Sequence, residues 1–500
     1  MNAVITALAR HGAAYPLRCA YADGERTVDY RSLNRAVITL AAWLRVEGAR
    51  VVALALENGP AWMIADLAVL AARLVCVPVP PFFSAAQQHH LLRDAGVDCI
   101  LTDRPDSFAA LQDAKPRTTG GDEVMLGEWR CVRLRIAPSG PRRLPPDTAK
   151  VTYTSGTTGT PKGVCLRSST LDTVARELAV ACELQRVDRH SSLLPLSTLL
   201  ENVGLYAHLL AGGCCTLRPL TGIATAGAGL DGRYLLERLA EDDATTSILV
   251  PEMMRALVQT MEHGAARPPA LRLLAVGGAP VSRRLLARAM SRGLPVYEGY
   301  GLSECGSVVA LNTPRANKPG TVGRPLPHVA LKFSATSEIL VRGATFAGYV
   351  GELGRSDEWH ATGDCGHLDE DGYLQLTGRG KNIFITSYGR NVSPEWVESE
   401  LTAQSAIGQA WVHGEARPWN VAVIAARAGA TAAEIDGAIR EANAALPEYA
   451  RVQRWIAASA PFSTANGQLT ANGRLRRDAL VAAYGSLLQQ LYTQDIHDVS

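Results

Sequence analysis

Short apolar runs of strand length alternate with longer segments of helical length, and this alternation constrains the fold more than any other feature. Val51–Leu56 is such a run, Ala61–Leu74 has the length of a helix, and Val75–Val79 is a second apolar run. Strand, helix and strand in this order imply a right-handed crossover between parallel strands. The pattern returns at Ser247–Val250 and Leu271–Val276. The sequence therefore predicts an α/β fold with a large N-terminal domain of mainly parallel sheets and flanking helices.

The pattern changes after Gly378. We expect a strand at Asn382–Thr386, a helix with Pro394 in its first turn, a strand at Val421–Ala426 and a helix at Ala432–Ala445. These shorter, mixed elements predict a second, smaller α+β domain in the C-terminal part of the chain.

Charge and hydropathy exclude some classes of partner. Lys and Arg number 50 against 48 Asp and Glu, so no global field draws the chain to nucleic acid or to an anionic membrane. The most apolar stretch, Trp62–Val79, is interrupted by Asp66, Arg73 and Pro78, so we expect no transmembrane segment. Met1–Arg10 has no basic stretch before a long apolar run, which argues against a secretory signal. We expect a cytoplasmic protein that binds no nucleic acid.

A run of hydroxyl side chains and glycines between Tyr153 and Gly163 contains Lys162, one of only six lysines in the chain. Glycines let the backbone close around an anion, hydroxyls donate hydrogen bonds to its oxygens, and a lysine adds positive charge. A plain flexible turn is the alternative for a glycine-rich run, but the hydroxyls and the lysine favour a phosphate-binding loop. The spacing does not fit a Walker loop. The expected phosphate-binding residues are Thr154, Ser155, Gly156, Thr157, Thr158, Gly159 and Lys162.

This loop resembles the signature of the adenylate-forming superfamily, which includes acyl-CoA synthetases, the adenylation domains of peptide synthetases and firefly luciferase. Other segments resemble further motifs of that family, in the family's order and over almost the whole chain. These segments are Glu298–Glu304, Trp359–Asp364, Gly378–Asn382 and Ser387–Glu395.

The resemblance implies a role for residues in each segment. The ring of Tyr300 would stack on adenine, and Glu304 would hold Mg²⁺ together with Thr157. The implied catalytic residues are Lys162, Glu304 and Arg474. Further nucleotide-binding positions implied by the resemblance are Gly278, Ala279, Glu298, Gly299, Gly301 and Ser303.

Asp364 and Arg379 would bind the ribose, a task that suits the acceptor-only carboxylate of Asp364. Lys381 would be the pivot of a hinge at residues 379–381, between a large domain, 1–378, and a small mobile domain, 382–500. A loop of the small domain would approach the thiol in a second reaction. The implied residues of this loop are Tyr388, Gly389 and Arg390.

The implied chemistry is the activation of a small-molecule carboxylic acid. The carboxylate attacks the α-phosphate of ATP, pyrophosphate leaves, and Mg²⁺ with Lys162 offsets the charge on the phosphates. Rotation of the small domain then brings the thiol to the acyl-adenylate. The thiol belongs to CoA or, in the alternative, to the phosphopantetheine of an acyl carrier protein.

The sequence departs from the family's pattern at three positions. Arg474 stands where the family carries a catalytic lysine, and its planar guanidinium does not reproduce a compact ammonium. Drift in an arginine-rich protein is one interpretation; the other is an altered or lost first reaction, which leaves a non-catalytic nucleotide- or acyl-binding protein. Leu194–Asn202 resembles long-chain acyl-CoA synthetases, with Thr198 and Asn202 replacing a usual histidine and arginine. We therefore predict a fatty or other apolar acid, with aromatic and hydroxy acids as alternatives.

Overall fold

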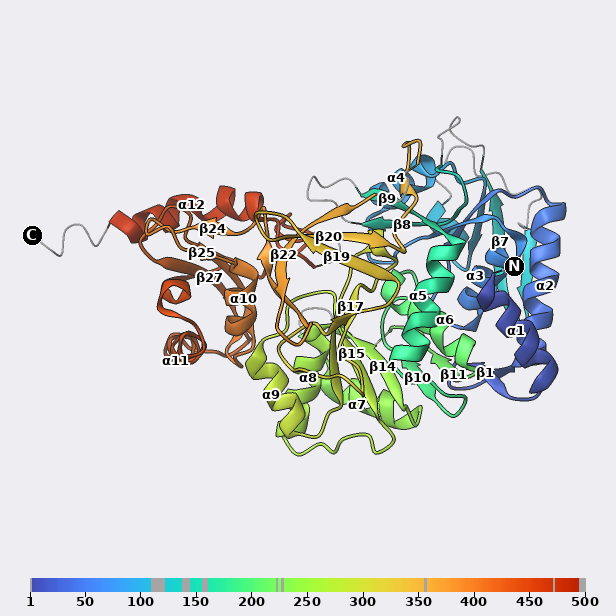
Figure 1. The fold of residues 1–500 in the computed structure, drawn as a ribbon, viewed down its shortest axis with the longest axis horizontal. Helices are drawn as coiled ribbons and strands as arrows, with labels where there is room; N and C mark the ends of the chain where they lie inside the picture. The colour runs from blue at the N-terminus through green and yellow to red at the C-terminus, as the bar shows by residue number, and fades with distance from the viewer. Residues whose placement is uncertain are drawn as a thin grey trace, which may run out of the picture.

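The computed structural model of the protein describes residues 2–108, 122–136, 144–154, 161–221, 224–225, 229–354, 358–470 and 473–493. Figure 1 shows a large N-terminal part, blue to yellow, beside a smaller C-terminal part, orange to red. Within the described ranges, no helix is both long and apolar enough to cross a membrane.

Two large sheets form the frame of the N-terminal part. In order across the sheet, the strands of the first are β18 (Arg324–Pro325), β17 (Ala310–Leu311), β16 (Val296–Tyr300), β15 (Leu273–Val276), β14 (Thr246–Leu249), β10 (Arg189–Ser192), β11 (Cys214–Leu217), β1 (Cys19–Ala22) and β2 (Thr27–Asp29). Those of the second are β21 (Gly348–Tyr349), β9 (Lys162–Arg167), β8 (Thr148–Thr154), β4 (Val75–Pro78), β3 (Val51–Ala55), β5 (Cys99–Thr102), β7 (Trp129–Arg135) and β6 (Asp122–Leu126).

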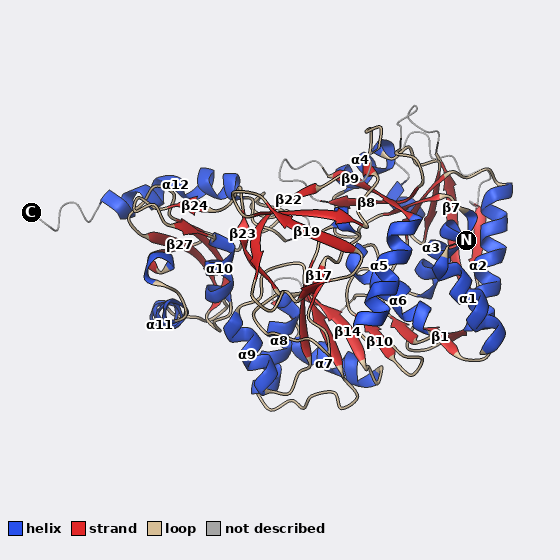
Figure 2. Ribbon diagram, viewed as in Figure 1, coloured by secondary structure: helices blue, strands red, loops and turns tan. Residues whose placement is uncertain are grey.

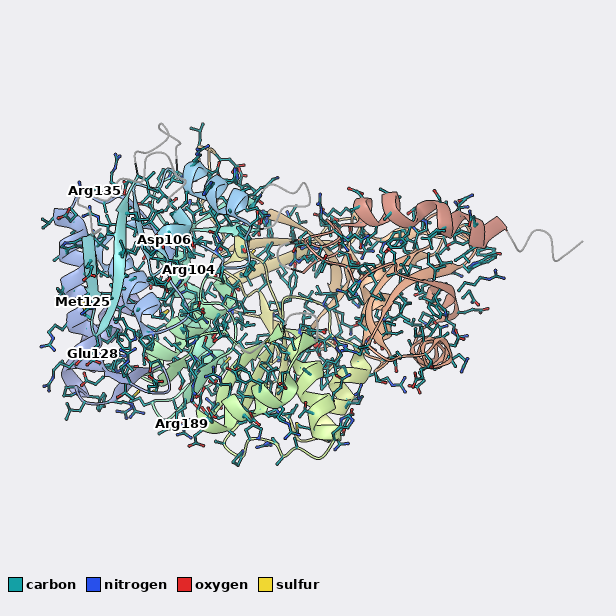
Figure 3. The ribbon with its side chains drawn as sticks, turned by 180° about the vertical axis from the view of Figure 1, so that it is seen from behind. Arg104, Asp106, Met125, Glu128, Arg135 and Arg189 are labelled. Carbon is teal, nitrogen blue, oxygen red and sulfur yellow. The ribbon has the colours of Figure 1, made fainter. Side chains whose placement is uncertain are left out.

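The centre of each sheet is parallel, as predicted. In the first sheet β14, β15 and β16 run parallel, and in the second β4, β3 and β5 do so. Antiparallel strands complete the edges. Seen from behind, Met125 and Glu128 mark the β6–β7 hairpin, at the end of the molecule opposite the C-terminal part (Figure 3). The mixed α/β class is therefore confirmed.

Helices lie between the sheets and cover their outer faces. Figure 1 shows α5 and α6 with the second sheet above them and the first sheet below. One core cluster joins buried residues of both helices to residues of both sheets, for example Val174, Leu205, Leu54 and Cys215. The helices and 3₁₀ turns of the N-terminal part are α1 (Ala3–Ala14), α2 (Tyr30–Val46), α3 (Pro60–Ala72), α4 (Ala85–Asp94), η1 (Pro105–Phe108), α5 (Ser168–Ala181), α6 (Leu199–Ala211), α7 (Gly232–Glu241), α8 (Pro251–Glu262), α9 (Arg283–Ser291) and η2 (Ser303–Cys305).

A third sheet, which the sequence did not predict, stands where the N-terminal and C-terminal parts meet (Figure 2). Its strands are all antiparallel, and each forms a hairpin or a return with its neighbour. In order they are β19 (Val329–Phe333), β20 (Glu338–Gly343), β22 (His360–Leu368) and β23 (Leu374–Arg379). A separate two-stranded ribbon pairs β12 (Ala224–Thr225) with β13 (Gly229–Leu230).

The C-terminal part contains its own small sheets and helices. These elements are β24 (Phe384–Ile385), β25 (Asn391–Val392), α10 (Pro394–Thr402), β26 (Ile407–His413), β27 (Asn420–Ala426), α11 (Ala432–Ala444), η3 (Glu448–Ala450), β28 (Val452–Ala457) and α12 (Arg477–Thr493). The strand expected at Asn382–Thr386 is shorter, because Asn382 and Ile383 both donate backbone hydrogen bonds to Arg379 and so form a turn.

The C-terminal part packs on α9 of the N-terminal part. The Ser282 hydroxyl, at the start of α9, donates a buried 2.8 Å hydrogen bond to Glu400 of α10. Arg288 donates to the carbonyl of Ala403, 3.0 Å away. These contacts fix the position of the C-terminal part in this conformation.

Two buried polar clusters lie around α6. In the first, the ammonium of Lys150 lies 2.7 Å from Asp66 and 3.0 Å from the Tyr206 hydroxyl, and it also donates to the amide oxygen of Asn202. Asn202 and Tyr206 in turn donate to Asp66. All four residues are buried. We call this set the Lys150 cluster; it joins α3, β8 and α6.

The second cluster pairs a buried carboxyl with buried imidazoles. Glu201 Oε1 lies 3.1 Å from His190 Nε2, and both side chains are inaccessible to solvent. Burial raises the pKa of Glu201 to about 8, and burial lowers the pKa of His190 to about 4. At neutral pH the Glu201 carboxyl therefore stays protonated beside a neutral His190 ring.

Replacing Glu201 with glutamine is expected to stabilise the protein progressively as the pH rises. An unfolded glutamate loses its proton near pH 4.3, whereas folded Glu201 holds it to about pH 8. Between these values folding must take up a proton, so wild-type stability falls as the pH rises and levels off above pH 8. Glutamine lacks this cost. Urea unfolding from pH 5 to 8 should show the gain of Glu201→Gln growing by on the order of 3 kcal/mol.

The matched control is Glu237→Gln, on the exposed side of α7. Its difference from wild type should stay flat with pH. A constant Glu201→Gln difference over the same range would contradict a buried, protonated carboxyl.

Candidate active site

The predicted phosphate loop begins and ends on paired strands. Thr154, the last residue of β8, pairs with Lys162, the first residue of β9. The strands thus bring the two ends of the loop together and place Lys162 at its exit. The predicted residues Ser155, Gly156, Thr157, Thr158 and Gly159 lie outside the described part of the chain.

Lys162 and Glu304 are linked through Tyr349. The Lys162 ammonium lies 5.8 Å from the centre of the Tyr349 ring, a cation–π geometry. The Tyr349 hydroxyl donates to Glu304 Oε1 over 2.9 Å. Glu304 lies in η2, and its backbone carbonyl accepts a 2.7 Å hydrogen bond from Phe346. A positive charge and a carboxylate therefore stand on either side of one tyrosine.

Tyr300, Asp364 and Arg379 form a second group. Asp364 on β22 and Arg379 on β23 are direct partners in the hairpin register, and Arg379 Nε lies 3.0 Å from Asp364 Oδ1. The hydroxyl of Tyr300, at the end of β16, donates to Asp364 Oδ2 over 2.8 Å. Burial, with the Asp364 charge adding to it, raises the pKa of Tyr300 well above its usual value. The hydroxyl thus stays protonated as a donor.

The glycines around Tyr300 are required by close packing or by backbone conformation. A Cβ on Gly301 would lie 1.8 Å from the carbonyl oxygen of Ser307, so a side chain cannot fit there. Gly278 follows β15 with a φ of +86°, which favours glycine. Gly278 and its neighbour Ala279 are exposed at the same strand-end edge as Tyr300. Exposed backbone at the carboxyl ends of parallel strands is where such sheets bind ligands.

The remaining predicted positions of the Tyr300 segment have structural contacts. Glu298 is buried, and its carboxylate accepts a 2.8 Å hydrogen bond from the backbone of Gly320. Burial raises the pKa of Glu298 to about 7. Gly299 packs against Leu311, and Ser303 begins η2. These residues hold the loop that carries Tyr300 and Glu304.

Arg474 approaches the residues of both groups from the C-terminal part. Desolvation lowers the pKa of its guanidinium, and the nearby charge of Arg379 lowers it further. The carboxylates of Asp364 and Glu304 act in the opposite direction. The residue as a whole is exposed. The structure thus places Arg474 within electrostatic reach of both groups described above.

The residues predicted for the hinge and for the thiol side lie in different surroundings. The pKa of Lys381 is lowered by desolvation and by the charges of Arg379 and Arg474. Tyr388 is 75% exposed in the turn between β24 and β25, and Gly389 and Arg390 are exposed beside it. In this conformation the turn is a surface feature of the C-terminal part.

Two residues at the site were missed from the sequence. Tyr349 carries no signal of its own, because its position depends on the pairing of β21 with β9. Glu338 accepts a 3.0 Å hydrogen bond from the backbone of Gly363, and it thereby holds the residue before Asp364. Both were detectable only once the register of the short strands was known.

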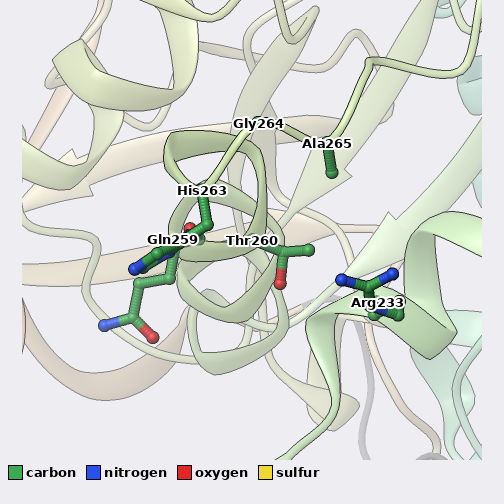
Figure 4. Close-up of a pocket in the computed structure, with 6 residues that line it drawn as sticks. All are labelled: Arg233, Gln259, Thr260, His263, Gly264 and Ala265. Atoms are coloured by element: carbon green, nitrogen blue, oxygen red, sulfur yellow. Dashed lines mark hydrogen bonds between the residues drawn. The ribbon is translucent and has the colours of Figure 1, made fainter.

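A pocket elsewhere on the surface does not contain this site. It lies between α7 and the C-terminal end of α8 and has a volume of about 420 Å³ (Figure 4). Its lining residues are Arg233, Gln259, Thr260, His263, Gly264 and Ala265. The predicted site residues are absent from this lining, so we assign the pocket no part in the site.

Comparison with known proteins gives a consistent result along the chain. Residues 8–353 match the AMP-binding enzyme family, and residues 381–496 match the AMP-binding enzyme C-terminal domain. The chain is 29% identical to the long-chain-fatty-acid–CoA ligase FadD15 of Mycobacterium bovis, over 87% of this chain and 86% of the relative. It is 28% identical to the indoleacetate–CoA ligase of Aromatoleum aromaticum, over 83% and 86%.

A solved structure shares the fold. The crystal structure of the anthranilate CoA ligase AuaEII in complex with anthranoyl-AMP superposes with a TM-score of 0.79 at 19% identity, covering 97% of each chain.

Proposed function

Because the chain belongs to the AMP-binding enzyme family, we propose that it is an acid–thiol ligase that converts a carboxylic acid to an acyl-adenylate with ATP and transfers the acyl group to CoA. One observation carries this proposal. Arg474 lies within electrostatic reach of Glu304, which Tyr349 links to Lys162, and of Asp364 and Arg379, which form one group with Tyr300.

The residues of the site fit a magnesium nucleotide. The Asp364 carboxylate, oriented by Tyr300 and Arg379, would accept hydrogen bonds from the two ribose hydroxyls. Glu304 would supply the oxygen ligand that Mg²⁺ prefers, and Thr157 would be a second ligand. The ion would offset phosphate charge. Lys162 would add a positive charge at the exit of the phosphate loop.

The C-terminal part would serve both reactions. Arg474 would stabilise the negative charge that develops during adenylation, since its guanidinium lies within electrostatic reach of Asp364 and Glu304. For the second reaction we propose rotation about a hinge at residues 379–381, with 1–378 and 382–500 as the two domains. The exposed turn with Tyr388, Gly389 and Arg390 would then line the path of the thiol.

For the acid we propose a fatty or other apolar substrate. The segment leading into α6 is rich in leucine, and Thr198 is uncharged and donates a hydrogen bond from its hydroxyl to the carbonyl of Pro195. Asn202 belongs to the Lys150 cluster, in which its amide bonds to Lys150 and Asp66. The relatives act, by their names, on long-chain fatty acids and on indoleacetate, so an aryl acid is the second candidate.

The test is a pyrophosphate-release screen over acids of varied chain length and aromatic content, with and without CoA. An acid-dependent release, followed by formation of a thioester with CoA, is expected. CoA and an acyl carrier protein should then compete for one preformed acyl-adenylate, and preferential loading of the carrier protein would replace CoA as the acceptor. A protein that binds ATP and acids yet never exchanges labelled pyrophosphate into ATP would contradict catalysis and support a binding protein.

Replacing Arg474 with lysine is expected to raise pyrophosphate release by about five- to tenfold at fixed substrate. A compact ammonium approaches the reacting oxygens as a point charge, whereas the guanidinium spreads its charge over a planar fork. Arg476→Lys, a conservative change in the same segment at an exposed residue, is the control and should leave the rate unchanged. An unchanged or lower rate in Arg474→Lys would show that lysine at position 474 does not improve pyrophosphate release.

A further inference from the structure

The two accessible cysteines of the protein lie against each other. The chain has ten cysteines, all of them in described segments, and eight are buried. The exceptions are Cys19 and Cys214, which are both half-buried. Their sulfur atoms are 2.7 Å apart, compared with about 2.05 Å in a disulfide bond.

The pair results from a β-bulge in the first sheet. Cys19 begins β1 and Cys214 begins β11, and these neighbouring strands run parallel with Tyr21 opposite Cys215. The register of β1 with β2 shifts between Cys19 and Tyr21, so one extra residue is inserted there. A bulge re-aims the side chain beside it. This shift accompanies the contact of Cys19 with Cys214, 195 positions away in sequence.

The surroundings make Cys19 the more reactive of the two thiols. A hydrogen bond from Cys214 lowers the pKa of Cys19, and the charge of Arg18 lowers it further. The same contact and burial raise the pKa of Cys214. Arg18 is held in place by a 3.1 Å hydrogen bond to the carbonyl of Gly212. Burial raises the pKa of most of the other cysteines, including the adjacent Cys215, which keeps them as unreactive thiols.

We propose that Cys19 and Cys214 are a redox-active pair that closes to a reversible disulfide when the protein meets a small-molecule disulfide such as oxidised glutathione. The Cys19 thiolate attacks one sulfur of glutathione disulfide, the S–S bond breaks, and one glutathione leaves as a thiolate. Cys214 then loses its proton to solvent and attacks the Cys19 sulfur, which releases the second glutathione. Two protein thiols are oxidised, and one glutathione disulfide is reduced to two glutathiones.

The new bond would tie the N-terminal segment to the turn after α6. Hydrogen bonds already join the two segments, since β1 pairs with β11 and the Tyr30 hydroxyl donates to the carbonyl of Gly213 over 2.7 Å. A covalent link would close a long loop and so restrict the unfolded chain. The proposal does not depend on the acid or thiol substrate. The pair lies on β1 and β11, near one edge of the first sheet, whereas β16, which carries Tyr300, lies near the other edge.

The experiment incubates the folded full-length chain in buffers of increasing oxidised-to-reduced glutathione ratio, then traps free thiols by alkylation and maps the peptides by mass spectrometry. We expect a species about 2 Da lighter, with one cross-link between the Cys19 and Cys214 peptides, which a dithiol reductant reverses. The eight buried cysteines should stay alkylatable only after unfolding. The melting temperature should rise on oxidation, on the order of 5 °C.

Variants separate the pair from ordinary surface thiols. Cys214→Ser should stop at a mixed disulfide between Cys19 and glutathione, and Cys19→Ser should leave Cys214 largely free. Both should retain the basal rate of pyrophosphate release. A wild-type chain that keeps glutathione on Cys19, a cross-link between Cys214 and Cys215, or two free thiols at every ratio would each overturn the proposal. The wild-type peptide map decides this even if a variant does not fold.

Discussion

Replacing Asp364 with alanine is expected to lower kcat/KM for ATP in pyrophosphate release by about 10²- to 10⁴-fold. Two hydrogen bonds from ribose hydroxyls to a carboxylate would be lost, each worth about 1.5–3 kcal/mol. The change also leaves Arg379 and the Tyr300 hydroxyl without an acceptor that each now contacts within 3.0 Å. Initial rates at saturating acid and varied ATP measure the effect.

A control on the same hairpin tests whether the loss is specific. Asp371 lies in the β22–β23 turn, where it pairs with Lys318 at the surface over 2.7 Å. Asp371→Ala should leave kcat/KM within about twofold, since an exposed pair contributes little. Asp364→Asn, which keeps the shape and one acceptor oxygen, should fall between alanine and wild type. A wild-type KM for ATP in a folded Asp364→Ala variant would remove the ribose from this carboxylate.

The parallel core was predictable because its strands are buried on both sides. A strand covered on two faces must be apolar throughout. The predicted strands Val51–Leu56 and Val75–Val79 each end within one residue of the observed strands, Val51–Ala55 and Val75–Pro78. The helix between them was predicted as Ala61–Leu74 and spans Pro60–Ala72, where it is buried on nearly all sides. Both predictions are confirmed.

The antiparallel sheet that carries Asp364 and Arg379 was not predictable in the same way. Along β19 the residues alternate between half-buried and exposed, so no continuous apolar run indicates a strand. The pairing of Asp364 with Arg379 follows from the hairpin register, which includes a shift between Cys365 and Gly366. Sequence motifs indicated that these two residues act on the same sugar. Only the register shows that they contact each other.

Contacts between distant segments were also beyond the sequence. Asn202 was noted as a departure at the acid-binding segment, but the structure turns its amide to Asp66 and Lys150 instead. Tyr349 joins Lys162 to Glu304, although the three residues come from different strands and a 3₁₀ turn. The chemistry of single residues can be read locally, whereas which of them meet is decided by topology.

The Lys150 cluster gives the largest effect that we expect on stability. Lys150→Met keeps the volume of the side chain but leaves the Asp66 carboxylate buried, with its exposed fraction at zero, and without its counter-ion. Removing one partner of a buried ion pair costs about 3–5 kcal/mol. Urea unfolding followed by tryptophan fluorescence should show this loss, since Trp62 lies beside the Lys150 ammonium. Lys318→Met, which breaks a surface pair with Asp371, should leave the urea midpoint unchanged.

The double variant Lys150→Met with Asp66→Asn distinguishes a charge effect from a packing effect. An asparagine at 66 carries no charge and can still accept hydrogen bonds from Asn202 and Tyr206, which now donate to Asp66. If the cost of Lys150→Met arises from an unpaired carboxylate, the second change should recover at least about 1 kcal/mol of it. Additive losses would instead mean that Lys150 acts by filling space between α3, β8 and α6. The sign of this coupling therefore decides between two roles for Lys150. Either its buried charge or the packing of its aliphatic side chain holds the start of β8 against α3 and α6.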